Sequence, residues 1–366
     1  MSAPPDTPDT PDNAARKPYQ RPLDIKRGRI DMGHGAGGKA AAQLIEELFL
    51  AELDNPYLRQ GDDGASLPLP GFDPAAGRLV MACDGHVVSP IFFPGGDLGS
   101  LAVHGTINDV AMLGAQPLYL SACFIIEEGY PLADLQRIVR SMGAAARAAG
   151  VPVVCGDTKV VERGKGDGVF ISTTGVGVVP AGVSISGRQA HPGDAVLLSG
   201  PIGAHGVAVL SQRESLAFAT SVQSDSAALH TLVAAVLAAA PGAVRVLRDP
   251  TRGGLATTLN EIAHQSGVGM VLDEAAIAVL PEVDAACELL GLDPLYVANE
   301  GKLVAICDPA AAPVVLAAMR AHPLAREAAQ IGSVQADAQQ FVQMRTRFGG
   351  RRVVDWLSGE QLPRIC

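Results

Sequence analysis

Strand-like and helix-like segments follow one another along this chain without a regular strand–helix–strand alternation. Leu79–Cys83 and Val169–Val179 have the apolar, β-branched character of strands, whereas Leu98–Leu113 and Leu132–Ala149 have helical patterns. With 366 residues the chain is long for a single hydrophobic core. Aromatic residues make up only 4%, and small apolar residues suit helices layered on sheets better than an all-β barrel. The pattern therefore predicts an α+β fold of two domains rather than a doubly wound parallel sheet.

Changes in composition along the chain predict four regions. Residues 1–27 are rich in Pro and Asp and poor in apolar residues, so we expect a disordered extension. A cluster of Pro and Gly near 180–193 marks a boundary between an N-terminal domain, 28–185, and a C-terminal α+β domain, 186–350. Residues 351–366 show no helical pattern and are expected to form a flexible tail.

Charge and cysteine usage exclude several classes of function. The chain has 28 basic and 38 acidic residues, a net charge of −10, and no basic run, which disfavours nucleic-acid binding. No uninterrupted apolar stretch approaches the roughly 18 residues that a membrane span needs, and no signal-peptide core is present. Six cysteines without CxxC spacing indicate free thiols in a reducing cytoplasm.

A glycine-rich loop at 33–39 precedes an amphipathic helical stretch that extends to about Leu53. Its spacing matches a P-loop through Lys39, but Ala40 occupies the position whose hydroxyl would bind magnesium. A true P-loop is therefore disfavoured. Glycine-rich backbone can still surround phosphate oxygens with its N–H groups, so the segment remains a candidate nucleotide-covering loop.

Aspartates occur at the ends of several predicted elements. Carboxylates in such positions suit Mg²⁺, which prefers oxygen ligands, water and substrate phosphates. Taken singly, an aspartate beside a glycine is as easily a turn or helix-capping residue. Asp109 differs, because a carboxylate buried inside an apolar helix is costly unless it is paired or bound to a metal. The set comprises Asp62 and Asp63 in a turn, Asp84 at a strand end, Asp109, Asp157 after a strand, and Asp249 before a helix.

The chain ends in a cysteine, Cys366, on a tail stiffened by Pro363. A thiol at the very end of a chain can enter a cleft and leave it with a group attached. The position does not match a prenylation box, where the cysteine is fourth from the end. An incidental exposed cysteine is the alternative reading of the tail alone.

A set of ordered motifs, from about residue 28 to the end, resembles the HypE family of hydrogenase maturation proteins. This family belongs to the superfamily of aminoimidazole ribonucleotide synthetase and selenophosphate synthetase. The motifs are His34–Gly38, Asp84–Val88, Phe93–Gly96, Gly105–Ala111, Gly156–Val161, Thr251–Gly254, Ala298–Lys302 and Pro363–Cys366. The resemblance implies two α+β domains, a homodimer through a barrel-like sheet of both N-terminal domains, and ATP held with aspartate-bound Mg²⁺ in a cleft.

The same resemblance implies a reaction. A carbamoyltransferase, HypF, places a carbamoyl group on the terminal thiol, and the protein then uses ATP to dehydrate this thiocarboxamide to a thiocyanate. The cyano group passes to iron on a HypC–HypD complex, as a ligand for [NiFe]-hydrogenase.

By resemblance, Cys366, Lys159 and Glu300 are the predicted catalytic residues. Glu300 would take an amide proton, and Lys159 would orient the thiocarboxamide or stabilise its oxygen. The predicted metal ligands are Asp63, Asp84, Asp109 and Asp249. The predicted ATP-binding residues are these four together with Asn108, Asp157, His34, Gly37 and Gly38. Lys39 and the N-terminal extension depart from the family pattern, and His86 is not assigned a role.

Two other functions stay open. The chain is a candidate for another synthetase of the superfamily, although a selenophosphate synthetase would want a reactive cysteine near the glycine loop, and 34–42 has none. It is also a candidate for a non-enzymatic carrier that only presents Cys366. A carrier needs no nucleotide site, so ATP hydrolysis separates the two.

Overall fold

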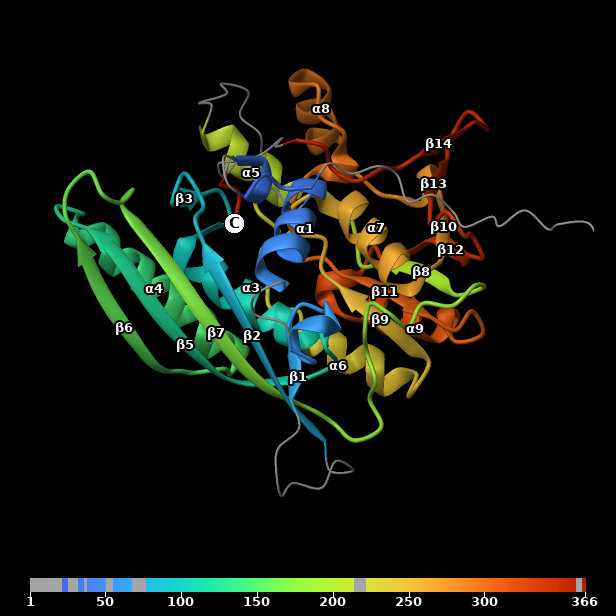
Figure 1. The fold of residues 1–366 in the computed structure, drawn as a ribbon, viewed down its shortest axis with the longest axis horizontal. Coiled ribbons are helices and arrows are strands. Elements are labelled where there is room, and N and C mark those ends of the chain that lie inside the picture. Colours follow the sequence, from blue (N-terminus) through green and yellow to red (C-terminus); the bar gives the residue numbers. More distant parts are fainter. Residues whose placement is uncertain are drawn as a thin grey trace, which may run out of the picture.

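The computed structural model describes residues 22–25, 32–35, 38–50, 55–67, 77–213, 222–359 and 364–366 (Figure 1). Two larger sheets, each with its own helices, form the two halves of the molecule, which confirms the predicted two-part α+β fold. Most of the predicted disordered extension and the predicted nucleotide contact Gly37 lie outside the described residues.

The N-terminal half contains a five-stranded sheet of order β1-β2-β7-β5-β6 and a short hairpin, β3-β4. Only the β5–β6 pair is parallel, and it is joined through a helix, as parallel neighbours require. The strands are β1 (Ala65–Leu67), β2 (Arg78–His86), β3 (Phe92–Phe93), β4 (Gly96–Asp97), β5 (Gln116–Glu127), β6 (Val153–Val161) and β7 (Val169–Val179). A short helix, α1 (Lys39–Leu44), and a π-helical turn, Ile45–Phe49, precede them.

Helices α3 (Leu98–Met112) and α4 (Leu132–Ala149) pack on one face of this sheet. Helix α3 is apolar around most of its circumference, which is typical of a central buried helix. It begins with a capping box, in which the Asp97 carboxylate accepts from the Gly99 and Ser100 N–H groups and the Ser100 hydroxyl faces the Asp97 N–H. Its C-terminal end reaches the core of the other half through Ala111 and Met112.

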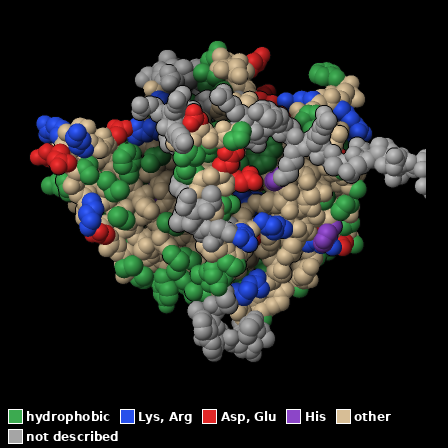
Figure 2. Space-filling model, in the orientation of Figure 1, with side chains coloured by type: hydrophobic (Ala, Val, Ile, Leu, Met, Phe, Trp, Pro, Cys, Tyr) green, Lys and Arg blue, Asp and Glu red, His purple; other side chains and the backbone are tan. Residues whose placement is uncertain are grey.

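The opposite face of the five-stranded sheet, which we call the outer face, is not covered by any described element. Met81, Val176 and Tyr119 form one cross-strand row on it, and Met81 and Tyr119 are 45% and 52% exposed. Figure 2 shows hydrophobic side chains gathered over the lower part of this sheet. Apolar exposure of this extent marks an interaction surface.

The C-terminal half is built on a seven-stranded sheet of order β14-β13-β10-β12-β8-β11-β9. Its strands are β8 (Ala195–Leu198), β9 (Val244–Arg248), β10 (Gly269–Asp273), β11 (Val304–Cys307), β12 (Ala329–Gln335), β13 (Val342–Arg345) and β14 (Arg351–Val353). Its helices are α5 (Ala204–Arg213), α6 (His230–Ala239), α7 (Gly254–Ser266), α8 (Pro281–Leu290) and α9 (Ala312–Ala321). Helix α7 packs in one core cluster of this sheet, and α6 and α9 pack in another.

The region predicted as a flexible tail from residue 351 contains ordered structure in its described parts. Strand β14 pairs with β13, and Val354 and Leu357 are buried. The last three residues lie beside α3 and the β3-β4 hairpin (Figure 1), where the Val87 N–H donates to the Cys366 carbonyl over 2.9 Å and the Ser89 N–H donates to the Arg364 carbonyl over 3.0 Å. These pairings explain the difference, because partners distant in sequence supply the hydrogen bonds that a local pattern cannot reveal.

No helix in the described part of the chain has both the length and the apolar character to cross a membrane.

Candidate active site

Acidic side chains from both halves converge where α3 meets the C-terminal sheet. Asp84 comes from β2, Asp109 from α3, Asp249 from the residue after β9, and Glu300 from the loop before β11. These carboxylates repel one another, and the pKa of Asp109 is raised by each of four neighbours: Asp249, Asp84, Asp63 and Glu300. The structure therefore brings the four predicted metal ligands and Glu300 into one electrostatic neighbourhood.

Gly105 lies next to these carboxylates, and its lack of a side chain leaves space between them. It lies one helical turn before Asp109 on the same face of α3. A Cβ added at Gly105 would lie 3.5 Å from Asp84 Oδ2, 4.0 Å from Glu300 Oε2 and 3.1 Å from His86 Cε1. The glycine thus leaves room between two carboxylates that any other residue would fill.

Burial makes these carboxyl groups reluctant to ionise. It is the first cause that raises the pKa of Asp63 to about 8 and that of Asp249 to about 6. Burial, reinforced by neighbouring carboxylates, also raises the pKa of Asp109 and of Glu300 well above their ordinary values. Clustered buried carboxylates with raised pKa values are characteristic of functional sites.

Two arginines partly offset the negative charge. Arg248 Nε lies 3.0 Å from Asp63 Oδ2, and its Nη2 donates to Glu261 Oε2 over 2.6 Å. Arg252, three residues after Asp249, interacts with Cys366, Asp84, Glu300 and Asp109, and proximity to Cys366 is the first cause that raises its pKa. The arginine therefore lies near both the terminal thiol and the carboxylates.

The terminal cysteine lies inside this site. Ile365 is 2% exposed and Cys366 is partly buried, and both pack with the core of the N-terminal half. Burial raises the pKa of the Cys366 thiol far above its ordinary value; Arg252 opposes the shift, and Glu300, Asp84 and Asp109 add to it. The docked thiol is consequently protonated at neutral pH.

His86, which was not assigned from the sequence, also belongs to the site. It is 1% exposed, its Nε2 lies 3.1 Å from the Thr173 hydroxyl and 3.7 Å from Asp84 Oδ2, and its Nδ1 has no partner. Burial lowers its pKa, so the ring is neutral. A neutral histidine next to Asp84 does not cancel the charge of that carboxylate.

Other predicted site residues have different surroundings. The Asn108 amide donates to the main-chain carbonyls of Ala227 and Glu300, and its oxygen accepts from the Leu229 N–H. Asn108 thus fastens α3 to the segments around it. Asp62, considered a possible helper, accepts from the Ser186 hydroxyl and the Gly187 N–H, and so ties its turn to the start of the C-terminal half.

Lys159 and Asp157 lie within β6 rather than after a strand, because the β5–β6 pairing continues to Val161. They form an exposed ion pair of 2.5 Å. Strand β6 is the sheet edge three strands from β2, or roughly 14 Å at the usual strand spacing. Within one chain the structure does not bring Lys159 to Glu300 and Cys366. Asp84 likewise lies inside its strand, paired with Thr173, rather than at a strand end.

The glycine loop contacts the C-terminal half. A Cβ on Gly38 would lie 2.3 Å from the Leu357 carbonyl oxygen, so only glycine permits this approach, and Lys39 pairs with Asp355 over 3.0 Å. His34 lies in a 3₁₀ turn, Met32–Gly35, and is partly buried.

The residues present fit a divalent cation with its own water and phosphate ligands. Glu300 Oε1 is buried without a hydrogen-bond partner, and repulsion among Asp63, Asp109 and Asp249 would be relieved by a cation. In the described residues no three acidic, His or Cys side chains already form a closed metal cage. Mg²⁺ needs none, since it usually binds one or two carboxylates together with waters and phosphates.

Comparison with known proteins identifies the family. The family models for the AIR synthase related protein match the chain with the N-terminal domain at 61–179 and the C-terminal domain at 191–345. The carbamoyl dehydratase HypE of Cupriavidus necator is 75% identical over 348 residues, which cover 95% of this chain and 98% of that protein. The chain belongs to the HypE family. The predicted resemblance to HypE, an enzyme family of the AIR synthetase superfamily, is therefore confirmed.

Crystal structures of HypE proteins have the same fold. A HypE–HypF complex matches with a TM-score of 0.81 and 46% identity, over 86% of this chain and 99% of that one. HypE in complex with ATP matches with a TM-score of 0.76 and 51% identity, over 92% and 99% of the two chains.

Sequence reasoning missed several residues near the site: His86, His205, Asp225, Arg252 and Lys302. The sequence did contain a local signal for Arg252, because this cation stands three residues after Asp249, just before the start of a helix. His205 had none, since its contact with Ile365 joins residues 160 positions apart.

Proposed function

We propose that this chain dehydrates a carbamoyl group carried on Cys366 to a thiocyanate, with ATP, and so supplies the cyanide ligands of [NiFe]-hydrogenase iron. One observation carries the proposal: the terminal residue is docked, with its carbonyl bound by the Val87 N–H and its thiol within electrostatic reach of Arg252, Glu300, Asp84 and Asp109. Membership of the HypE family and the solved complex of a HypE with ATP support it.

The chemistry explains why such a site is needed. An amide oxygen is a poor leaving group, and the amide must also lose two protons to become a nitrile. ATP, when bound with Mg²⁺, supplies the phosphoryl group that turns the oxygen into a leaving group. The carboxylates Asp63, Asp84, Asp109 and Asp249 would hold the metal and its triphosphate.

Glu300 is the proposed base for the amide protons. Its carboxyl is 3% exposed, one oxygen has no partner, and it interacts with Arg252 and Cys366. Once ionised, its carboxylate is a stronger base than that of an exposed glutamate, because burial raises its pKa. Arg252 would stabilise negative charge that develops near the carbamoyl oxygen, in a site shielded from water.

The partners follow from the same proposal. HypF would load the thiol, as the solved complex of a HypE with HypF supports, and a HypC–HypD complex would accept the cyano group. All six cysteines are free, which supports work in a reducing cytoplasm.

A homodimer through the outer face is part of the proposal. The exposed row Met81–Val176–Tyr119 supports it, and so does Ile125, which is 40% exposed on the same face. Lys159 lies beside Ile125 across the β5–β6 pair, so a dimer through this face would bring the partner subunit near Lys159, and its predicted role is to be tested in the dimer.

Intact-protein mass spectrometry tests the reaction. The protein is incubated with HypF, carbamoyl phosphate and ATP, and then with excess Mg²⁺–ATP or a non-hydrolysable analogue. A carbamoyl adduct on Cys366 should lose the mass of one water only with hydrolysable ATP, and Cys366→Ser should carry no adduct that does so. A persistent adduct would indicate a carrier, and no adduct would favour another synthetase of the superfamily.

A further inference from the structure

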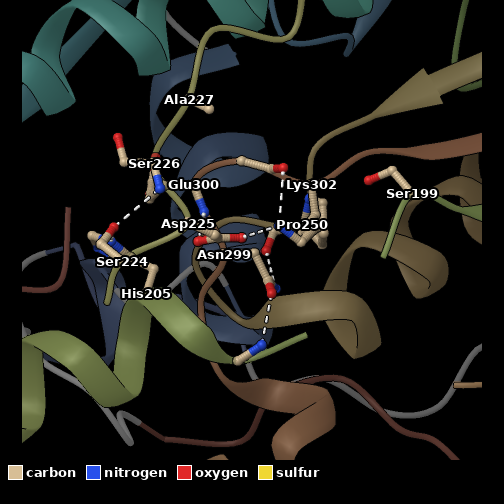
Figure 3. Close-up of polar contacts among 12 residues, drawn as sticks. Ser199, His205, Ser224, Asp225, Ser226, Ala227, Pro250, Asn299, Glu300 and Lys302 are labelled. Atoms are coloured by element: carbon tan, nitrogen blue, oxygen red, sulfur yellow. Dashed lines mark hydrogen bonds and ion pairs between the residues drawn. The ribbon is translucent and has the colours of Figure 1, made fainter. Parts of the chain in front are cut away.

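A short segment between α5 and α6, Ser224–Ala227, contacts the Glu300 loop directly and is linked to the docked tail through His205. Figure 3 shows its side chains directed to opposite sides, with Ser224 toward His205 and Asp225 toward Glu300 and Lys302. The segment is itself anchored, because the Ser224 N–H donates to the Pro94 carbonyl over 2.8 Å and Ser226 contacts His104 over 2.9 Å.

The first arm runs through His205 to the tail. His205 is fully buried in α5, with Nδ1 2.7 Å from the Ser224 hydroxyl and Nε2 2.7 Å from the Ile365 carbonyl oxygen. A carbonyl can only accept, so Nε2 must carry the proton, and Nδ1 then accepts from Ser224. Phe93 packs edge-on against the ring at 5.4 Å and fixes its plane.

The second arm runs through Asp225 to Glu300. Asp225 Oδ1 accepts from the Glu300 N–H over 3.1 Å, and Oδ2 lies 3.1 Å from Lys302 Nζ. Both ends of this ion pair are largely buried, with 7% and 13% of their side chains exposed. Ala227 completes the contact, since its N–H donates to the Glu300 carbonyl over 3.2 Å.

The Ser224–Ala227 segment and the Glu300 loop lie so close together at Gly301 that this position has no room for a side chain. A Cβ on Gly301 would lie 1.7 Å from the Asp225 carbonyl oxygen. The Glu300 loop therefore cannot shift toward the segment, and the hydrogen bonds on either side hold it from shifting away.

We propose that Ser224–Ala227 is a positioning element that fixes the docked Cys366 and the Glu300 carboxyl relative to each other, with His205 as the residue through which it holds the Ile365 carbonyl of the tail. Neither His205 nor Asp225 touches the thiol itself. They act through the Ile365 carbonyl and the Glu300 backbone. One part of the inference rests on the proposed function, namely that fixed relative positions of Cys366 and Glu300 favour dehydration. The docking of the tail does not rest on it, because docking can be measured separately.

Alkylation of Cys366 by iodoacetamide, read by peptide mass spectrometry, measures docking without ATP or a carbamoyl group. His205→Gln keeps a donor at the reach of Nε2, whereas His205→Asn is too short for it. We expect alkylation to rise roughly tenfold in His205→Asn, about the worth of one buried hydrogen bond, and to stay within about threefold of wild type in His205→Gln. Buried Cys287 and Cys307 must stay unmodified, which verifies the fold.

Equal alkylation rates in wild type and His205→Asn, with Cys287 and Cys307 protected, would overturn the role of His205. If His205→Asn fails to fold, Ser224→Ala takes its place, because it removes only the hydroxyl that orients the ring. We then expect a several-fold rise in alkylation, and no rise would equally overturn the inference.

The second arm is tested on carbamoyl-loaded protein by single-turnover loss of water. Asp225→Asn keeps the acceptor for the Glu300 N–H but loses the charge that pairs with Lys302. We expect wild-type alkylation of Cys366 and dehydration slowed about tenfold, the effect of a displaced catalytic group. Unchanged dehydration would remove Asp225 from the element. Failure of the wild type to lose water would instead contradict the proposed function and leave the docking result standing.

Discussion

Glu300 is a buried acidic residue of the site, with 3% of its surface exposed. Asp63 has Arg248 at 3.0 Å, whereas Glu300 Oε1 has no hydrogen-bond partner in the described structure. Glu300→Gln conserves shape and removes the base. We expect ATP binding and carbamoyl loading to persist and the dehydration step to slow by about 10²–10⁴-fold. Single-turnover mass spectrometry measures this, and a rate within threefold of wild type would exclude Glu300 as the base.

The raised pKa values of Asp63 and Asp249 predict how Mg²⁺ binding depends on pH. Folded-state values of about 8 and 6 exceed those of the unfolded chain, so this contribution to stability is complete below about pH 4 and lost as pH rises toward 8. Ionised carboxylates then repel one another unless a cation binds. We therefore expect Mg²⁺ to raise the Tm more at pH 8.5 than at pH 5.5.

The control for this measurement is Asp249→Asn, which removes one of the two titrating groups. The difference between the Mg²⁺-induced Tm shifts at the two pH values should shrink in this variant. A Mg²⁺ effect that is independent of pH in the wild type would contradict the prediction.

At the residue scale, the sequence indicated which side chains could take part in the reaction but not which of them lie close together in the fold. Asp84, Asp109 and Glu300 were recognisable because each stands in a motif, and Asp249 because it precedes a helix. All four do converge. Lys159 also stands in a motif, yet the side-by-side pairing of β5 and β6 carries it to an exposed edge. The role of Asn108 as a main-chain anchor depends on three carbonyl and N–H partners that only the folded chain brings near.

At the scale of elements, α3 is the scaffold of the site, and its glycines have distinct tasks. A Cβ on Gly99 would lie 2.1 Å from the Ile138 carbonyl oxygen on α4, whereas one on Gly105 would enter the space between Asp84 and Glu300. We expect Gly99→Ala to destabilise the protein by about 2–3 kcal/mol through overpacking. Gly105→Ala should change the free energy of unfolding little but weaken Mg²⁺–ATP binding at least tenfold.

Denaturant unfolding and calorimetric titration of the two variants provide the comparison, and each variant is the other's control. The assignment of Gly105 to the site would be wrong if Gly105→Ala bound Mg²⁺–ATP like wild type.

Most elements were predictable because their apolar periodicity is local. The bounds of α4 and β7 match the predicted ones, and those of α3 differ by one residue. Helix α5 was missed because Ala204–Val209 contains small and β-branched residues without helical spacing, and it is buried almost throughout. Strand β14 was missed because three exposed residues become a strand only through their pairing with β13.

At the scale of the whole molecule, the bare outer face predicts self-association. Ile125→Glu places a charge on that face, and Val314→Glu, on the exposed side of α9, is the matched control with a similar change in polarity. We expect light scattering to give a dimer for wild type and Val314→Glu and a monomer for Ile125→Glu. A monomeric wild type would refute the proposed dimer.

The docking of the tail also affects when the terminal sulfur can react. Burial raises the pKa of the docked Cys366 thiol, so the docked sulfur is a weaker nucleophile than one on an undocked tail. Under the proposed function, we therefore expect carbamoyl loading with the tail outside the site and loss of water after the tail has returned. We therefore expect the docked, unloaded sulfur to react more slowly with oxidants than a sulfur on an undocked tail.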